Sequence, residues 1–133
     1  MMVYLAGPSA ELPRVREAAA QIEAAGHVIT GRWWEKVADG GVCASDTDHP
    51  EPILAAAADR NARGIDTADV VIALCREAGG LSPGVAHEVG YAQGICTSVV
   101  FVGNASGHLA PRWPLGGDVA ETVAGALAIL GAL

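Results

Sequence analysis

Aromatic residues, basic residues and long apolar runs are all scarce in this sequence. Aromatic side chains make up 5% of its 133 residues, and eight Lys and Arg stand against fifteen Asp and Glu, which gives a net charge of −7. A chain with this charge repels polyanions, so we expect no nucleic-acid polymer as a partner. No apolar run approaches the roughly 18 residues of a membrane span, so we expect no membrane segment either.

Cysteine is scarce as well, and no leader sequence is visible. Cys43, Cys75 and Cys96 form no CxxC pair, and the histidines show no metal-ligand spacing. We therefore expect reduced thiols, and neither a metal nor an organic cofactor. Residues 1–7 lack a basic region followed by an apolar stretch and a cleavage site, which predicts a cytoplasmic protein.

Apolar residues are abundant. They form 51% of the chain, whereas charged residues form 17%, and this composition excludes intrinsic disorder. A chain of this length can bury roughly two thirds of its unfolded surface without a disulfide or a metal. The length also predicts a single domain over residues 1–133.

Strand-like and helix-like segments alternate along the chain. Short apolar runs predict buried strands at residues 2–6, 27–30, 70–74 and 97–102, and residues 31–49, 76–82 and 104–117 are predicted loops. Helical patterns predict helices from Ser9 to Gly26, from the Asp48 cap to about Gly64, from Pro83 to about Gly94, and from the capping pair Asp118 and Glu121 onward. This alternation predicts an α/β fold, a doubly wound parallel sheet with helices on both faces.

Ligands of such sheets bind beyond the carboxyl ends of the strands. Four segments should therefore surround one crevice: residues 6–9, which include Gly7, the loop with Trp33 and Trp34, residues 74–88, and residues 102–107. Gly7 is expected to contact a substrate. Either tryptophan could stack on a nucleobase, with Trp34 as the candidate, and packing of the pair onto the sheet is the alternative.

The stretch from Gly79 to Ala92 carries the strongest signal for chemistry. Its glycines flank a predicted helix start, where backbone N–H groups and the positive end of the helix dipole favour anions. Glu88 lies off the apolar stripe of this helix, near its start. A carboxylate held ionised there would suit a nucleophile, and a solvent-facing glutamate favoured by the dipole is the alternative.

Three motifs in order, at residues 3–8, 65–73 and 84–92, together resemble the nucleoside 2-deoxyribosyltransferase family, which includes the 2′-deoxynucleoside 5′-monophosphate N-glycosidases. The resemblance implies a flavodoxin-like sheet and a nucleoside or nucleotide substrate. It places Glu88 as the nucleophile that attacks the deoxyribose and forms a covalent glycosyl-enzyme, with Tyr4 orienting it. It also implies a homodimer or a larger even-numbered assembly.

Two positions depart from the family pattern. Asn61 stands where the family usually has an aspartate that contacts the substrate, and an amide cannot carry a proton to the leaving base. Ser82, followed by Gly84, matches the monophosphate N-glycosidases, and with the helix amides it could bind a 5′-phosphate. Ser82 as a simple helix N-cap is the alternative.

Three interpretations remain open from the sequence. The first is an enzyme that cleaves the N-glycosidic bond of 2′-deoxynucleosides or their 5′-monophosphates through Glu88, passing the sugar to a base or to water. The second is a non-catalytic nucleotide-binding or sensing module, which Asn61 favours. The third is a structural or partner-binding α/β domain, which leaves the coincidence of Tyr4, Gly84 and Glu88 unexplained.

Overall fold

The computed structural model describes residues 1–38, 49–105 and 116–132. Five strands form one parallel sheet in the order β2-β1-β3-β4-β5. This is the flavodoxin-like order, and it confirms the predicted doubly wound sheet. The strands are β1 (Met2–Ala6), β2 (Val28–Thr30), β3 (Val70–Leu74), β4 (Ser98–Val102) and β5 (Asp118–Ala120).

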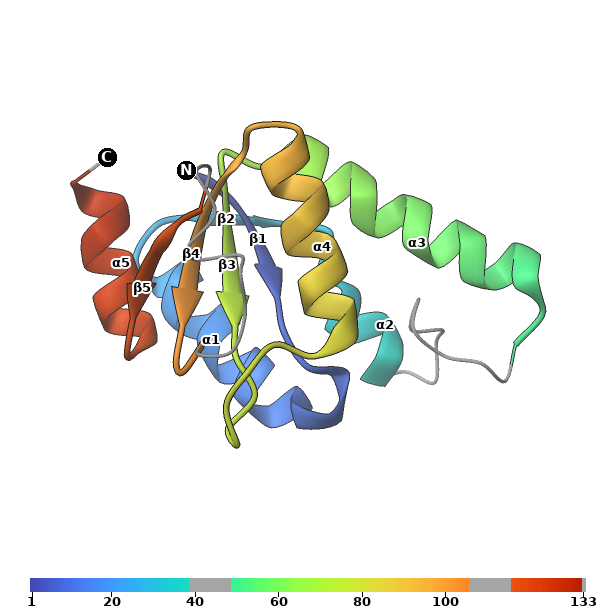
Figure 1. Cartoon of the computed structure of the whole chain (residues 1–133), viewed down its shortest axis with the longest axis horizontal. Helices are drawn as coiled ribbons and strands as arrows, with labels where there is room; N and C mark the ends of the chain where they lie inside the picture. The colour runs from blue at the N-terminus through green and yellow to red at the C-terminus, as the bar shows by residue number, and fades with distance from the viewer. Residues whose placement is uncertain (39–48, 106–115, 133) are drawn as a thin grey trace.

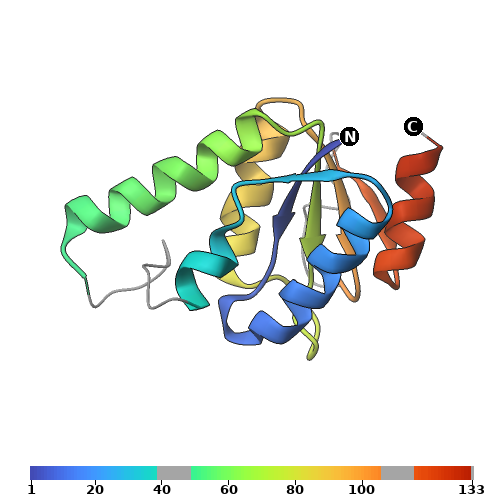
Figure 2. The same cartoon turned by 180° about the vertical axis from the view of Figure 1, so that it is seen from behind.

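Helices cover both faces of the sheet (Figures 1 and 2). On one face lie α1 (Leu12–Ala24), which follows a short 3-10 turn, and α5 (Val123–Gly131). On the other face lie α3 (Glu51–Asp66) and α4 (Pro83–Gly94), which contact each other. The short helix α2 (Trp33–Ala38) follows β2 and contacts α1.

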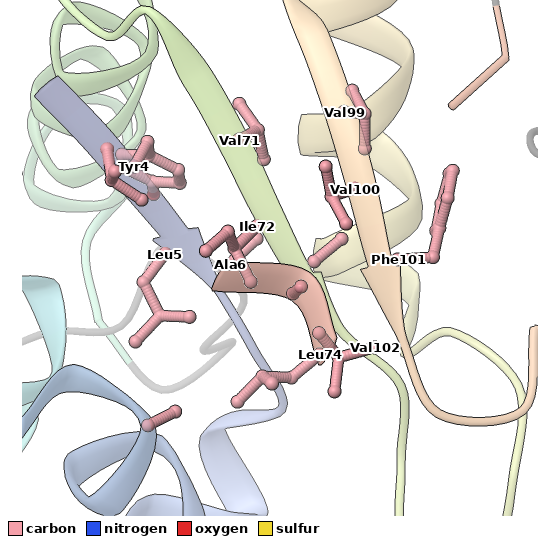
Figure 3. Close-up of a cluster of buried hydrophobic side chains, with 14 of the residues drawn as sticks. Tyr4, Leu5, Ala6, Val71, Ile72, Leu74, Val99, Val100, Phe101 and Val102 are labelled. Carbon is pink, nitrogen blue, oxygen red and sulfur yellow. The ribbon is translucent and has the colours of Figure 1, made fainter. Parts of the chain in front are cut away.

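The centre of the core is the apolar strand β3, all of whose residues are buried. Its neighbours β1 and β4 each expose only their first residue, so the side chains of three adjacent strands fill the space under the helices (Figure 3). Near-continuous apolar strands are the pattern expected of a parallel sheet covered on both faces. The predicted strands at 2–6 and 70–74 are thereby confirmed.

Two predicted boundaries were wrong. The segment predicted as a loop from residue 31 contains α2, and residues 39–48 of that segment lie outside the described part. Asp118 and Glu121 do not cap the last helix, because Asp118–Ala120 forms β5 and pairs with Val100–Val102. The cap of α5 is Thr122, whose Oγ1 accepts a hydrogen bond of 3.1 Å from the Gly125 amide.

Helix α3 departs from its prediction at both ends. It begins at Glu51 after Pro50, which makes no side-chain cap, and it runs to Asp66, past Gly64. Its amino-terminal half extends away from the sheet (Figure 1, green), and Ile53 there is 46% exposed. The buried residues of α3 are Ala57, near its middle, and Gly64 and Ile65 in its carboxyl-terminal half. No helix in the described ranges is long and apolar enough to cross a membrane.

Candidate active site

A pocket of about 610 Å³ opens at the carboxyl end of the sheet, between α3, α4 and the segments that follow β1 and β2. This is the edge at which parallel α/β sheets bind ligands. Three of the four predicted crevice segments contribute to it. The fourth, 102–107, adds no described residue to the lining, and residues 106 and 107 lie outside the described part. The described lining consists of Gly7, Ser9, Trp33, Ala58, Asn61, Ala62, Ile65, Ser82, Pro83, Gly84, His87, Glu88 and Tyr91.

Glu88 projects from α4 into this pocket, and its Oε2 is shielded from solvent without a hydrogen-bond partner among the described residues. Burial raises the pKa of Glu88 from 4.5 to about 7, although the Tyr4 hydroxyl lowers it in part. The direction of this shift opposes the expectation of a carboxylate held ionised by the helix, and the shielded Oε2 does not fit the solvent-facing alternative. Glu88 lies past the first turn of α4, where the dipole no longer compensates for burial.

Tyr4 lies behind Glu88 rather than in the pocket. It is fully buried on β1, and it is absent from the described lining. Its hydroxyl lowers the pKa of Glu88. Tyr4 therefore acts on Glu88 from outside the described pocket lining.

Asn61, Ser82 and Gly84 meet at the pocket from two helices. The Asn61 Oδ1 on α3 is buried and has no hydrogen-bond partner among the described residues. Ser82 is the N-cap of α4, and its Oγ accepts a hydrogen bond of 3.4 Å from the Val85 amide. A side chain at Gly84 would meet nothing within 4 Å, so this glycine leaves the start of α4 open to the pocket.

The two tryptophans have different surroundings. Trp33 lines the pocket and is fixed by its indole Nε1, which donates a hydrogen bond of 2.8 Å to the Leu5 carbonyl. Trp34 is only 2% exposed and packs in the core, with the Arg32 guanidinium 5.3 Å from its ring centroid. The assignment of Trp34 as a substrate contact was therefore wrong. Adjacent residues of a helix point about 100° apart, so α2 turns one indole to the pocket and the other to the core.

The model of the nucleoside 2-deoxyribosyltransferase family matches residues 3–124, most of the chain. The chain belongs to this family. No curated protein matches the sequence significantly.

Three solved structures show the same fold as this family member at low sequence identity. A 2-deoxyribosyltransferase from Bacillus psychrosaccharolyticus is 16% identical with a TM-score of 0.67, over 93% of this chain and 88% of that one. A conserved protein from Enterococcus faecalis is 17% identical with a TM-score of 0.64, over 100% and 99% of the two chains. The Clostridium botulinum CMP N-glycosidase is 16% identical with a TM-score of 0.63, over the full length of both.

The pocket of this family member also includes Tyr91, which the sequence reasoning missed, and His87, which lies in the predicted crevice segment 74–88 but was not expected to be a site residue. The Tyr91 hydroxyl donates a hydrogen bond of 2.6 Å to the Asp66 carboxylate, joining α4 to α3. Together with Gly84 and Glu88, His87 and Tyr91 form one helical face at spacings of three and four residues. Extending that face from Glu88 would have found them. Among the described residues, no group of His, Cys, Asp and Glu could hold a metal ion.

Proposed function

We propose that this chain is an enzyme that cleaves the N-glycosidic bond of 2′-deoxynucleosides or their 5′-monophosphates, with Glu88 as the nucleophile. The observation that carries the proposal is the shielded, unpartnered Glu88 Oε2 that faces a pocket of about 610 Å³. A cavity of this volume lies within the range of small-molecule sites. The family match and the activities named for two of the similar structures support the same class of reaction.

The proposed reaction has two steps at one carbon. The Glu88 carboxylate attacks the anomeric carbon of the deoxyribose, an ester bond forms, and the base departs with the electron pair of the broken C–N bond. Water or a second base then attacks the same carbon, and the ester breaks to return the carboxylate. Two displacements give overall retention of configuration. The Tyr4 hydroxyl, which lowers the pKa of Glu88, is proposed to hold the carboxylate in line for this attack.

The departing base needs a proton or hydrogen bonds on its ring. Asn61 supplies a hydrogen bond from the α3 side of the pocket, but its amide supplies no proton. A base that leaves readily as an anion, or that is protonated by solvent, therefore suits this site best.

The start of α4 is the proposed place for a 5′-phosphate. The Ser82 hydroxyl uses its oxygen to cap the helix, and its proton stays available to donate to a phosphate oxygen. Gly84 leaves room beside it, and helix N-termini favour anions.

An assembly of even-numbered copies and a cytoplasmic location stay predictions. The overhanging half of α3 offers exposed apolar surface, including Ile53, for such an assembly.

The second candidate is a nucleotide-binding or sensing module without turnover, which Asn61 favours because it leaves the pocket without the family's aspartate. One experiment separates the two. The protein is incubated with deoxynucleosides and their 5′-monophosphates, with and without an acceptor base, and the products are separated by chromatography. Free base without acceptor indicates a hydrolase, and base exchange indicates a transferase. Thermal stabilisation by ligand with no product in any mixture would contradict the enzyme proposal and support the module.

A further inference from the structure

The aromatic ring of Tyr4 lies against two glycine backbones. A Cβ atom at Gly64 on α3 would lie 3.0 Å from both Cδ2 and Cε2 of the ring, and one at Gly31 would lie 3.3 Å from Cε2. Carbon atoms in contact prefer separations of about 3.5–4.0 Å. Any side chain at Gly64 would therefore push the ring from its place, and Gly31 has in addition a φ of +75° that favours glycine.

Thr30 fixes Gly64 in this position. The Oγ1 of Thr30, at the end of β2, donates a hydrogen bond of 2.7 Å to the Gly64 carbonyl. Thr30 is only 8% exposed, so this bond is sheltered from water. It joins α3 to the sheet beside the ring of Tyr4.

These contacts continue to the proposed nucleophile. Tyr4 is 0% exposed, its ring is bounded by the Gly31 and Gly64 backbones, and its hydroxyl is near enough to Glu88 on α4 to lower the pKa of that carboxyl. We infer that Gly64, held by Thr30, is a positioning residue that fixes the Tyr4 ring and thereby keeps its hydroxyl on Glu88. Gly64 is absent from the described lining of the pocket that holds Glu88, so we expect it to act through Tyr4. The inference rests on the proposed function only where it predicts rates of turnover, and its effect on the Glu88 pKa does not depend on that function.

The test substitution is Gly64→Ala. The added methyl displaces the ring and moves its hydroxyl away from Glu88, and the pKa of Glu88 then rises further, because the interaction that lowers it is lost. Alanine is favoured over glycine inside a helix, which offsets part of the strain. In turnover we expect kcat at pH 7 to fall about tenfold with little change in KM, and the acid limb to move to higher pH.

Three further variants isolate the cause. Thr30→Val keeps the shape but removes the hydroxyl that holds Gly64, so it should move the Glu88 pKa in the same direction, whereas Thr30→Ser keeps the hydroxyl and should not. Gly90→Ala on α4 is the matched control, because a methyl there meets nothing within 4 Å. In a Tyr4→Phe background, Gly64→Ala should add no further shift, since its effect passes through the lost hydroxyl.

The primary measurement needs no substrate. The Glu88 carboxyl is titrated by carbon NMR in the native protein and in each variant, with the Glu88→Gln spectrum assigning the signal. A raised Glu88 pKa in Gly64→Ala and Thr30→Val, with native values in Thr30→Ser and Gly90→Ala, supports the inference. A native Glu88 pKa in the folded Gly64→Ala protein overturns the inference. If Gly64→Ala does not fold, a native Glu88 pKa in Thr30→Val overturns it instead. Absence of turnover in the native protein would sink the proposed function and leave this result standing.

Discussion

The buried Tyr4 hydroxyl on β1 lowers the pKa of Glu88 on α4, yet that pKa remains raised to about 7. Burial of the carboxylate outweighs the effect of the neighbouring hydroxyl that stabilises its charge. Near neutral pH the group therefore exists in both protonation states. A nucleophile needs the ionised form, so the balance between these two effects sets the pH at which this site can work.

Replacing Glu88 tests the proposed nucleophile. Glu88→Gln keeps the size of the side chain but cannot form the ester, so turnover should fall at least about 1000-fold. Glu17→Gln, on the exposed side of α1, is the matched control and should keep native activity. Rates are followed by chromatography of released base. Activity in Glu88→Gln within tenfold of native would refute the mechanism.

The native protein should lose activity on the acid side of neutrality. The carboxylate is the reactive form, so kcat/KM should rise with pH through an apparent pKa of about 7 and level off above it. If kcat/KM does not change between pH 5 and 8, then either the pKa of Glu88 lies outside this range or Glu88 is not the nucleophile.

The same pKa makes stability depend on pH. Glu88 binds its proton more tightly in the folded protein than in the unfolded chain, so folding takes up a proton between pH 4.5 and about 7. This stabilisation is fully present below pH 4.5 and is lost as pH rises through 7, by up to about 3 kcal/mol. Urea unfolding of native protein and Glu88→Gln at pH 5 and pH 8 measures it. The fall in the free energy of unfolding from pH 5 to pH 8 should be smaller in the variant, and equal falls would contradict the raised pKa.

Ser82 decides the proposed preference for a 5′-phosphate. The native protein should bind a deoxynucleoside monophosphate more tightly than the nucleoside, and Ser82→Asp should reverse that order, because a carboxylate repels the phosphate. Aspartate also caps helices, so the fold should persist. Thr122→Asp makes the same change at the cap of α5 and should leave both affinities unaltered. Equal native affinities in calorimetry would remove the phosphate proposal.

A substitution at Asn61 tests whether the absence of the family's usual aspartate limits the rate. Asn61→Asp restores a carboxylic acid at the pocket, so if protonation of the leaving base limits the rate, kcat should rise several-fold below the pKa of the new group. The gain should vanish as pH rises and the acid ionises. Asn61→Ala removes the hydrogen bond without adding an acid, and it should only lower the rate. An Asn61→Asp profile identical to native would mean that the departing base needs no proton from this side.

Much of the fold could be predicted from local sequence. The apolar run at Val70–Leu74 could only be a covered central strand, and Ser82 followed by Pro83 marked the start of α4. Strand β5 was not predicted because it is three residues long and two of them are exposed. Its pairing with β4 is made by the backbone, and backbone pairing leaves no periodic signal in so short a segment.

The site could be predicted in outline but not in its energetics. The sequence brings Glu88 near the start of a helix, but its pKa depends on what packs around it in three dimensions. Periodicity likewise could not separate Trp33 from Trp34, because the rotation of α2 about its axis is set by the contact with Leu5. Properties that depend on neighbours distant in the chain were the ones missed.

Helix α3 has two ends with different stability. Its carboxyl-terminal half is held by the Thr30–Gly64 and Tyr91–Asp66 hydrogen bonds, whereas its first turns lie beyond the sheet. Short helical segments without tertiary contacts are marginal in water, so we expect these turns to open at a lower local free energy than the rest of the molecule. Asn61 lies in the carboxyl-terminal half, soon after the outer turns. Fraying of the outer turns should therefore change the conformational entropy next to this pocket residue without any movement of the sheet.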